Sequence, residues 1–321
     1  MRIFAVVFCA LLSPLASAAA PEYPEKPIRW VVPWPPGGGV DITTRTLSPA
    51  LSEALGQSLI VENRPGASGM VGTSFAAKAP PDGYTILTGA AGPNAILQHL
   101  NPKVPYDGLR DFGSVVYIAN TLYVLVVHPT LPAKNVQELI ALAKTRPGEL
   151  TIGSAGSGTP AHLAGYFLAT LSGVKLVHVS YKGAAGPAID VISGHIVMTI
   201  ETISPLLPHL RAGKLKALGV TSRKRSSQLP AVPTIAESGL KDYEIVNWYG
   251  LLVPAGTPAA AIEKLNRSAS HVLARADVRE RLVASGLEIV GSTSEEFGKF
   301  RQADFEKWGR VVRTANIKFE P

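Results

Sequence analysis

The sequence predicts an α/β fold made of two doubly wound lobes. The unit of an apolar run, a glycine-rich turn and a helical stretch recurs along the chain, and the same rhythm restarts after about residue 122. The 321 residues are 46% hydrophobic and 17% charged, which is typical of a globular chain rather than a disordered one. This length favours two domains over one.

The first half supplies three strand-turn-helix units. The apolar runs Ile28–Val32, Ser58–Asn63 and Tyr84–Gly89 are the expected strands. Each leads into a turn rich in glycine or proline and then into a helical stretch, the first of which runs from Asp41 to about Leu55. Strands and helices that alternate in this way favour a mainly parallel sheet.

The second half repeats the pattern. Tyr123–Pro129 is expected to be a strand and Asn135–Thr145 a helix, because the latter has apolar residues at helical spacing. The stretch "LTIGSAGSGTPAHLAGYFLATL" predicts another strand, turn and helix, and "KLVHVSY", "IVMTI" and Leu215–Ser222 predict further strands. The chain then enters "AAIEKLNRSASHVLARADVRERLVASG", which is typical of a long amphipathic helical region.

The N-terminus has the features of a secretory signal peptide. Arg2 precedes a short apolar core, and "ASAAA" offers small-residue cleavage sites, so we expect residues 1–18 to be removed. The single cysteine, Cys9, would leave with this segment, which excludes disulfides, a thiol nucleophile and cysteine-ligated metals in the mature chain. The expected location is the periplasm.

Charge and motifs exclude several functional classes. The net charge is +7, but no run of Lys and Arg is longer than Arg223–Arg225, so nucleic-acid binding has little support. The seven histidines lack metal-ligand spacing, and the chain has neither a G-x-S-x-G nucleophile elbow nor an H-E-x-x-H motif. We therefore expect no enzyme activity, no cofactor and no metal.

Four strand-to-helix turns are candidate ligand sites: Pro33–Asp41, Gly89–Asn94, Gly153–Thr159 and Glu201–Pro205. In an open α/β sheet, ligands bind at the carboxyl ends of strands, where helix N-termini offer free N–H groups and partial positive charge. The glycine-rich turns lack the phosphate-binding and dinucleotide-binding patterns, so a carboxylate is the favoured anion. A single such turn is more often structural, but several in two lobes favour a cleft.

Some of these residues have a structural alternative. Asp41 is expected to cap its helix, and Thr159 with Pro160 to form an N-cap followed by the first helical residue. His162 either points into the cleft or is a helix-capping or packing residue. The remaining candidates are Trp34 (a cleft wall), Trp248 (a cleft wall or core) and Glu201 (a ligand contact or a cap).

Several long blocks resemble the solute-binding proteins of tripartite tricarboxylate transporters, the Bug receptors. They include "YPEKPIRWVVPWPPGGGVDITTRTLSPALSEALGQSLIVENRPGASGMVG", "TIGSAGSGTPAHLAG", "VSYKGAAGPAIDVISGHI" and "WYGLLVPAGTP", and the resemblance covers essentially the whole mature chain. It implies the type II periplasmic binding-protein fold, with two lobes joined by two crossover strands and a cleft between them. The implied lobes are residues 23–121 with 248–321, and residues 122–247.

The resemblance also implies how a ligand is held. Backbone N–H groups of the two glycine-rich loops, Trp34–Asp41 and Ser154–Thr159, would bind a carboxylate. With the residues singled out above, the expected site comprises Trp34, Pro36, Gly37, Gly38, Gly39, Asp41, Ala90, Ala91, Asn94, Ser154, Ala155, Gly156, Ser157, Thr159, His162, Tyr181, Lys182, Gly183, Glu201 and Trp248.

The function implied is a periplasmic receptor, expected to be monomeric, that captures an organic carboxylate and docks on membrane permease subunits. Many relatives have Phe where this chain has Trp34, and Asp where it has Glu201, which favours an aromatic or larger carboxylate over a small dicarboxylate. Two alternatives stay open: a receptor that feeds a signalling pathway, and an exported hydrolase using Ser154 or Ser157 near His162.

Overall fold

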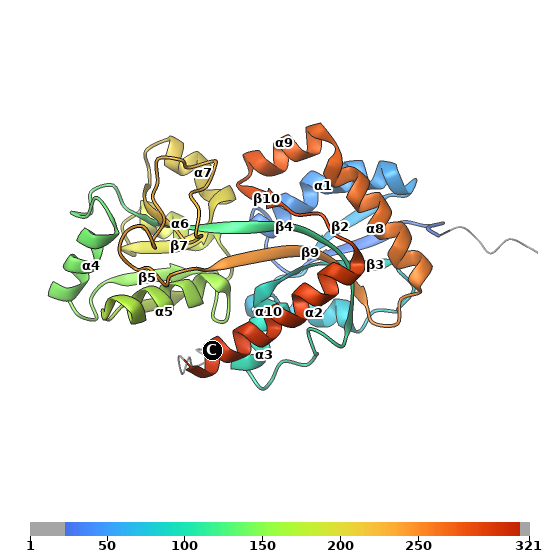
Figure 1. The fold of residues 1–321 in the computed structure, drawn as a ribbon, viewed down its shortest axis with the longest axis horizontal. Coiled ribbons are helices and arrows are strands. Elements are labelled where there is room, and N and C mark those ends of the chain that lie inside the picture. The colour runs from blue at the N-terminus through green and yellow to red at the C-terminus, as the bar shows by residue number, and fades with distance from the viewer. Residues whose placement is uncertain (1–22, 315–321) are drawn as a thin grey trace, which may run out of the picture.

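The computed structural model describes residues 23–314, so the predicted signal peptide lies outside the described residues. The chain forms a ten-stranded mixed sheet with helices on both faces (Figure 1). Along the sheet the strands follow the order β2-β1-β3-β9-β4-β7-β5-β6, and β8 and β10 also pair with β4.

The strands are β1 (Ile28–Val32), β2 (Leu59–Asn63), β3 (Thr85–Ala90), β4 (Phe112–Val127), β5 (Thr151–Ser154), β6 (Val177–Ser180), β7 (Met198–Thr202), β8 (Lys216–Val220), β9 (Val246–Pro254) and β10 (Leu287–Ile289). The helices are α1 (Gly39–Leu55), α2 (Met70–Ala77), α3 (Leu97–Leu100), α4 (Val136–Thr145), α5 (Pro160–Ser172), α6 (Ala185–Ile192), α7 (Ile203–Arg211), α8 (Ala259–Ala274), α9 (Ala276–Ala284) and α10 (Ser294–Thr314), with short helical turns η1 (Ala67–Gly69) and η2 (Gly92–Ile96).

The strand β4 belongs to both halves of the sheet. It pairs with β9 as far as Leu122, opposite Val246, and then with β7 from Tyr123, opposite Thr202. Strands β1, β2 and β3 lie on the β9 side, and β5 and β6 lie on the β7 side. The two long strands β4 and β9 therefore run side by side through the middle of the molecule (Figure 1).

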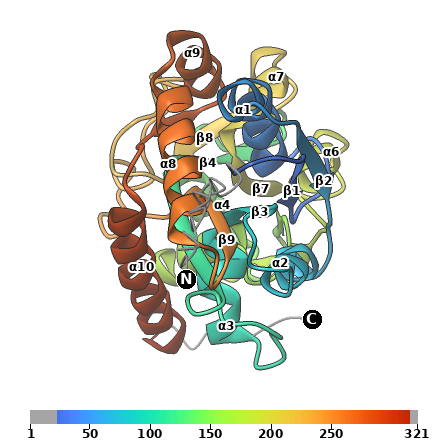
Figure 2. The ribbon, with the colours of Figure 1, turned by 90° about the vertical axis from the view of Figure 1, so that its right-hand side faces the viewer.

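Side chains that point alternately to the two faces of the sheet explain why helices cover both faces. In β1, Ile28, Trp30 and Val32 pack in one apolar cluster with α1, α8 and α9, whereas Val31 packs in another with α2 and α10. Successive strand residues face opposite sides, so a strand that is apolar throughout is covered on both faces. Figure 2, which looks along the long axis, shows these helices arranged around the strands.

The other half of the sheet follows the same rule. On one face, β4 residues pack against α6 and α7, and on the other face the core includes α4 and α5. Helix α5 begins as predicted, since the Thr159 side chain accepts a hydrogen bond from the His162 N–H at 3.2 Å and Pro160 is the first helical residue. The predicted fold class and most predicted strands are therefore present.

Some elements differ from the expectation. The long helical region after Pro258 is two helices, α8 and α9, because Arg275 has an extended backbone between them. Strand β4 begins at Phe112, well before the predicted Tyr123. Helix α10 was not predicted; its Phe297 and Trp308 are fully buried, so it is part of the core.

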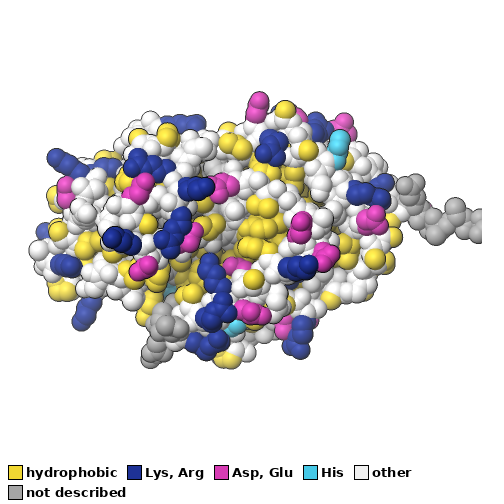
Figure 3. Space-filling view, in the orientation of Figure 1, with side chains coloured by type: hydrophobic (Ala, Val, Ile, Leu, Met, Phe, Trp, Pro, Cys, Tyr) yellow, Lys and Arg dark blue, Asp and Glu magenta, His cyan; other side chains and the backbone are white. Residues whose placement is uncertain are grey.

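The charged surface bears on nucleic-acid binding, and the hydrophobicity of the helices bears on membrane crossing. On the face shown in Figure 3, Lys and Arg side chains are scattered over both halves and alternate with Asp and Glu, rather than forming one basic patch. Across residues 23–314, no helix combines the length and the hydrophobicity that a membrane crossing requires. Within the same range, His, Cys, Asp and Glu side chains form no cluster suited to a metal ion.

Candidate functional site

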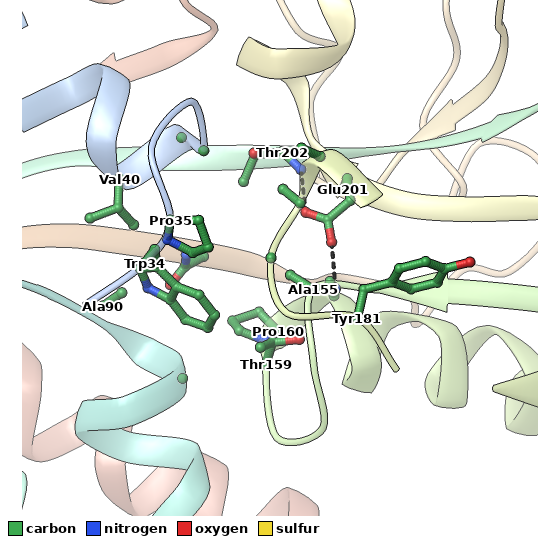
Figure 4. A pocket seen from close by; sticks show the side chains of 18 of the residues that line it. Trp34, Pro35, Val40, Ala90, Ala155, Thr159, Pro160, Tyr181, Glu201 and Thr202 are labelled. Carbon is green, nitrogen blue, oxygen red and sulfur yellow. Dashed lines mark hydrogen bonds between the residues drawn. The ribbon is translucent and has the colours of Figure 1, made fainter. Parts of the chain in front are cut away.

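A cavity of about 250 Å³ lies where the two halves of the sheet meet. The β1–α1 turn and Ala90 form one side, and the other side consists of the loop after β5, the start of α5, the segment that leads into α6 and the end of β7 (Figure 4). The two central strands contribute Tyr123, Asn247 and Tyr249 between them. The wall is mostly apolar, and the predicted residues that line it are Trp34, Pro36, Gly38, Gly39, Ala90, Ala155, Thr159, Tyr181, Lys182, Gly183 and Glu201.

The β1–α1 turn presents free N–H groups to this cavity. Helix α1 begins at Gly39, and neither Gly39 nor Val40 has an intramolecular acceptor for its N–H among the described residues. Gly39 must be glycine for the wall to close: a Cβ there would lie 2.6 Å from the Tyr249 hydroxyl oxygen and 3.0 Å from Thr202 Oγ1. The amino end of α1 therefore meets two hydroxyl groups, that of Tyr249 from the central strand β9 and that of Thr202 from the opposite side.

Asp41 supports the turn from behind instead of capping the helix as expected. It is the third residue of α1, it is 3% exposed, and it does not line the cavity. Its Oδ2 accepts the Gly37 N–H at 2.9 Å, and its Oδ1 accepts Arg45 Nε and Asn63 Nδ2, each at 2.9 Å. Asn63 Nδ2 also donates to the Trp34 carbonyl oxygen at 2.9 Å. Asp41 thus fixes the path of the turn.

The N–H groups of the loop after β5 form hydrogen bonds within the chain. The expectation was that they would be free to bind a ligand. Every N–H from residue 155 to residue 159 has an acceptor within the chain. The pairs are Ala155 with Glu201 Oε1 (2.8 Å), Gly156 with Ser154 Oγ (3.3 Å), Ser157 with Ser180 Oγ (3.2 Å), Gly158 with His162 Nδ1 (3.2 Å) and Thr159 with the Gly156 carbonyl (3.3 Å). Only Ala155 and Thr159 of this loop line the cavity.

The amino end of α6 supplies the free N–H groups on that side. Residues 182–186 all line the cavity, Ala184 is an N-cap without a side-chain bond, and the described residues provide no acceptor for the N–H groups of residues 183–186. Lys182 is exposed in the same segment. Sequence reasoning reached Gly183 but missed Ala184, Ala185 and Gly186, although "KGAAG" after an apolar strand has the same character as the other turns.

Glu201 is a buried carboxyl in the cavity wall. It is 2% exposed, Oε1 accepts the Ala155 N–H at 2.8 Å, and Oε2 accepts the Thr202 N–H at 3.3 Å (Figure 4). Burial raises the pKa of Glu201 to about 8, although the two backbone hydrogen bonds lower it. Beside it, Thr202 Oγ1 is buried in the wall and has no hydrogen-bond partner among the described residues.

The two candidate tryptophans have different places in the structure. Trp34 lines the cavity from the β1–α1 turn (Figure 4). Trp248 is 2% exposed in the core, where its ring packs against Phe297 and its indole N–H donates to Asp304 Oδ2 at 2.7 Å. Trp248 does not line the cavity. Of the two roles considered for it, the structure therefore shows the core role.

The remaining candidates position the wall from behind. The Ala91 N–H donates to Asn247 Oδ1 at 3.0 Å, and Asn94 Oδ1 accepts the Ala90 N–H at 3.1 Å, so both shape the end of β3. The His162 ring packs on His178, with centroids 4.2 Å apart.

The serine geometry does not match the hydrolase alternative. Ser154 Oγ lies 2.7 Å from Nε2 of His178, which is not the histidine of that alternative. Ser154 and Ser157 both lie outside the cavity wall, and both are buried.

The chain is similar to proteins of one known family. Residues 43–317 match the family model described as tripartite tricarboxylate transporter family receptor. The chain is 35% identical to protein BugT of Bordetella pertussis (strain Tohama I) over 322 residues, which covers 99% of both chains. It superposes on an R. palustris protein solved with adipate (TM-score 0.90, 34% identity, 92% of this chain and 99% of that one).

A second solved structure is MatC from Rhodopseudomonas palustris with bound malate (TM-score 0.85, 29% identity, 90% of this chain and 100% of that one). These matches confirm the predicted periplasmic binding-protein fold. The chain therefore belongs to the tripartite tricarboxylate transporter receptor family, the Bug proteins, whose members are periplasmic solute-binding receptors and not enzymes.

Proposed function

We propose that this protein captures an organic carboxylate in the cavity between its two lobes and delivers it to permease subunits of a tripartite transporter. One observation carries the proposal: the free N–H groups at the amino ends of α1 and α6 and the unpaired Thr202 hydroxyl converge on a mostly apolar cavity. Such groups bind anions, and the relatives solved with adipate and malate hold carboxylates.

Energetics favour a ligand held from both sides. A hydrogen bond to a charged group contributes roughly 1.5–3 kcal/mol, whereas micromolar affinity needs about 8 kcal/mol. The α1 turn alone would supply only part of this energy. The amino end of α6, across the cavity, supplies a second set of donors, and the apolar wall between them contributes by burying the body of the ligand.

We propose residues 23–121 with 248–321 as one lobe and residues 122–247 as the other. The partner of β4 changes from β9 to β7 between Leu122 and Tyr123, which supports a hinge there. Contacts across the cavity, such as Gly39 against Thr202, support a ligand-dependent closure of the two lobes.

A carboxylate panel tests this function. Adipate, malate, citrate and benzoate are compared with the neutral amides adipamide and benzamide. We expect at least one acid to raise the melting temperature by roughly 5 °C at a hundredfold excess over its dissociation constant. Small-angle scattering should show compaction with the same acid, and the amides should do neither. Failure of every acid in both measurements would refute the proposal.

The transport role has a separate test. The protein, loaded with the acid that binds most tightly, is crosslinked to membranes of the cells that produce it. Recovery of multi-span permease subunits supports transport, and recovery of a sensor protein instead would assign the receptor to signalling.

The two tryptophans provide a matched pair of variants. Trp34→Ala should weaken binding of the tightest acid at least about tenfold, because an aromatic cavity wall is lost. Trp248→Phe should leave affinity within about twofold but lower the free energy of unfolding by roughly 1–3 kcal/mol, since it removes the hydrogen bond to buried Asp304. Calorimetry and thermal melting measure both. If Trp248→Phe lost affinity and Trp34→Ala did not, Trp248 rather than Trp34 would be the tryptophan that contacts the ligand.

A further inference from the structure

Among the described residues, the cavity wall contains one carboxyl group, that of Glu201. Its two oxygens accept N–H groups from opposite sides, Ala155 on the loop after β5 and Thr202 in its own strand. No Lys, Arg or His forms an ion pair with it among the described residues, and it is 2% exposed. A carboxyl without a cation partner in an apolar wall is costly to ionise.

The position of Glu201 relative to the anion donors is what matters for function. Thr202, the next residue, places its unpaired hydroxyl within reach of the amino end of α1, where a Cβ on Gly39 would lie 3.0 Å from Thr202 Oγ1. A ligand carboxylate held by the α1 N–H groups and Thr202 would therefore share the cavity with the Glu201 carboxyl. Two ionised carboxylates cannot share such a site at low cost.

Other titratable groups at this wall do not neutralise Glu201. Tyr123 from β4 and Tyr249 from β9 are both buried, and burial raises the pKa of each well above its usual range, so both stay neutral. Tyr181 also lines the cavity, but its hydroxyl points away and donates to Asp190 Oδ2 at 2.5 Å (Figure 4). Lys182 is exposed, on the segment before α6.

Two histidines lie behind the loop after β5. His178 contacts Ser154, and His162 accepts the Gly158 N–H, so both act on the loop rather than on the Glu201 carboxyl.

We propose that Glu201 is a specificity-determining residue that, as a neutral carboxylic acid, donates a hydrogen bond to the carboxylate of the ligand. This inference rests on the proposed function and adds its regulation: the receptor binds a carboxylate together with one proton on Glu201. The Glu201 O–H then complements the free N–H groups of α1 and the Thr202 hydroxyl. When Glu201 is ionised, the same oxygen repels the ligand.

The pH dependence follows from the acid form being the one that binds. Because the pKa of Glu201 in the free protein is about 8, most of the protein holds the proton at pH 6 and pH 7. At pH 9 only about a tenth holds it, and affinity should fall about tenfold. The ligand carboxylate makes ionisation of Glu201 still harder, so binding above pH 8 should draw a proton from solution.

The test is calorimetry with the tightest-binding member of the panel of adipate, malate, citrate and benzoate, at pH 6, 7.5 and 9. Wild-type affinity should fall about tenfold between pH 6 and pH 9. Glu201→Gln keeps an acceptor for the Ala155 N–H and a neutral donor for the ligand, so it should bind with no alkaline loss. Glu201→Ala should bind more weakly than Glu201→Gln at every pH.

Lys182→Gln is the control for the lysine of the cavity wall: it should lower affinity by the same factor at each pH and leave the profile unchanged. A second measurement needs no variant. Wild-type titrations at pH 8.5 in buffers of different ionisation enthalpy should show uptake of between about half a proton and one proton per ligand.

A pH-independent wild type, no proton uptake, or the same alkaline loss in Glu201→Gln would overturn the inference while leaving carboxylate binding in place. Absence of binding at pH 6 by every acid would instead refute the proposed function.

Discussion

Asp41→Ala should lower the free energy of unfolding by about 3 kcal/mol and weaken carboxylate binding by at least about tenfold. The buried carboxylate accepts hydrogen bonds from Gly37, Arg45 and Asn63, and Asn63 in turn holds the Trp34 carbonyl. Removing Asp41 takes an acceptor from each of these donors, leaves the Gly37 N–H unpaired, and frees the turn that presents the α1 N–H groups. Urea unfolding and calorimetry with the tightest-binding acid measure the two effects.

Arg45→Ala is the matched control. Its side chain is half exposed and its ion pair with Asp41 follows helical i,i+4 spacing, so the cost should be about 0–1 kcal/mol with little change in affinity. If Asp41→Ala were as mild as Arg45→Ala, Asp41 would not be what fixes the turn.

The second large effect is expected from Gly156→Ala, which should weaken binding of the same acid at least about tenfold. A Cβ at this position would lie 2.5 Å from Ser68 Oγ, which belongs to the opposite proposed lobe. Gly156 also has a φ of 138°, which an L-residue rarely adopts, at a strain cost of about 1–3 kcal/mol. The proposed closure of the lobes would bring Gly156 against Ser68, whereas the backbone strain does not depend on closure.

A double variant separates these two costs. Ser68 has a φ of 55°, in the left-handed region that glycine adopts freely, so Ser68→Gly should be tolerated. Gly156→Ala with Ser68→Gly should recover most of the affinity but not the stability. Small-angle scattering should show that the ligand compacts the double variant but not Gly156→Ala alone. Equal affinity of the single and double variants would show that the loss is backbone strain and not impaired closure.

Local patterns in the sequence were sufficient for the fold class and for the cap of α5. Apolar runs followed by glycine-rich turns identified most strands, because a strand covered on both faces is apolar throughout. The Thr159–Pro160 helix start was also predicted correctly, since capping involves residues only three apart. Helix α10 was missed, although its Phe297 and Trp308 complete the core.

The site was only partly predictable, because its chemistry depends on which donors are already paired. The loop after β5 looks as open as the β1–α1 turn, yet its Ala155 N–H is taken by Glu201, 46 residues away in the chain. Trp34 and Trp248 likewise both sit in apolar, glycine-containing stretches. Their roles diverge because Asp304, 56 residues further on, holds the Trp248 indole N–H in the core.

The sequence by itself therefore determined the alternating architecture, the family, and the kind of turn that could hold an anion. All three depend on patterns of residues that lie close together in the chain. Only the tertiary structure decided which N–H groups remain free, which tryptophan forms the wall, and that Glu201 is buried beside the anion donors. The physical reason is that hydrogen-bond satisfaction and burial are set by partners distant in the chain, and these partners meet only when the two halves of the sheet pack together.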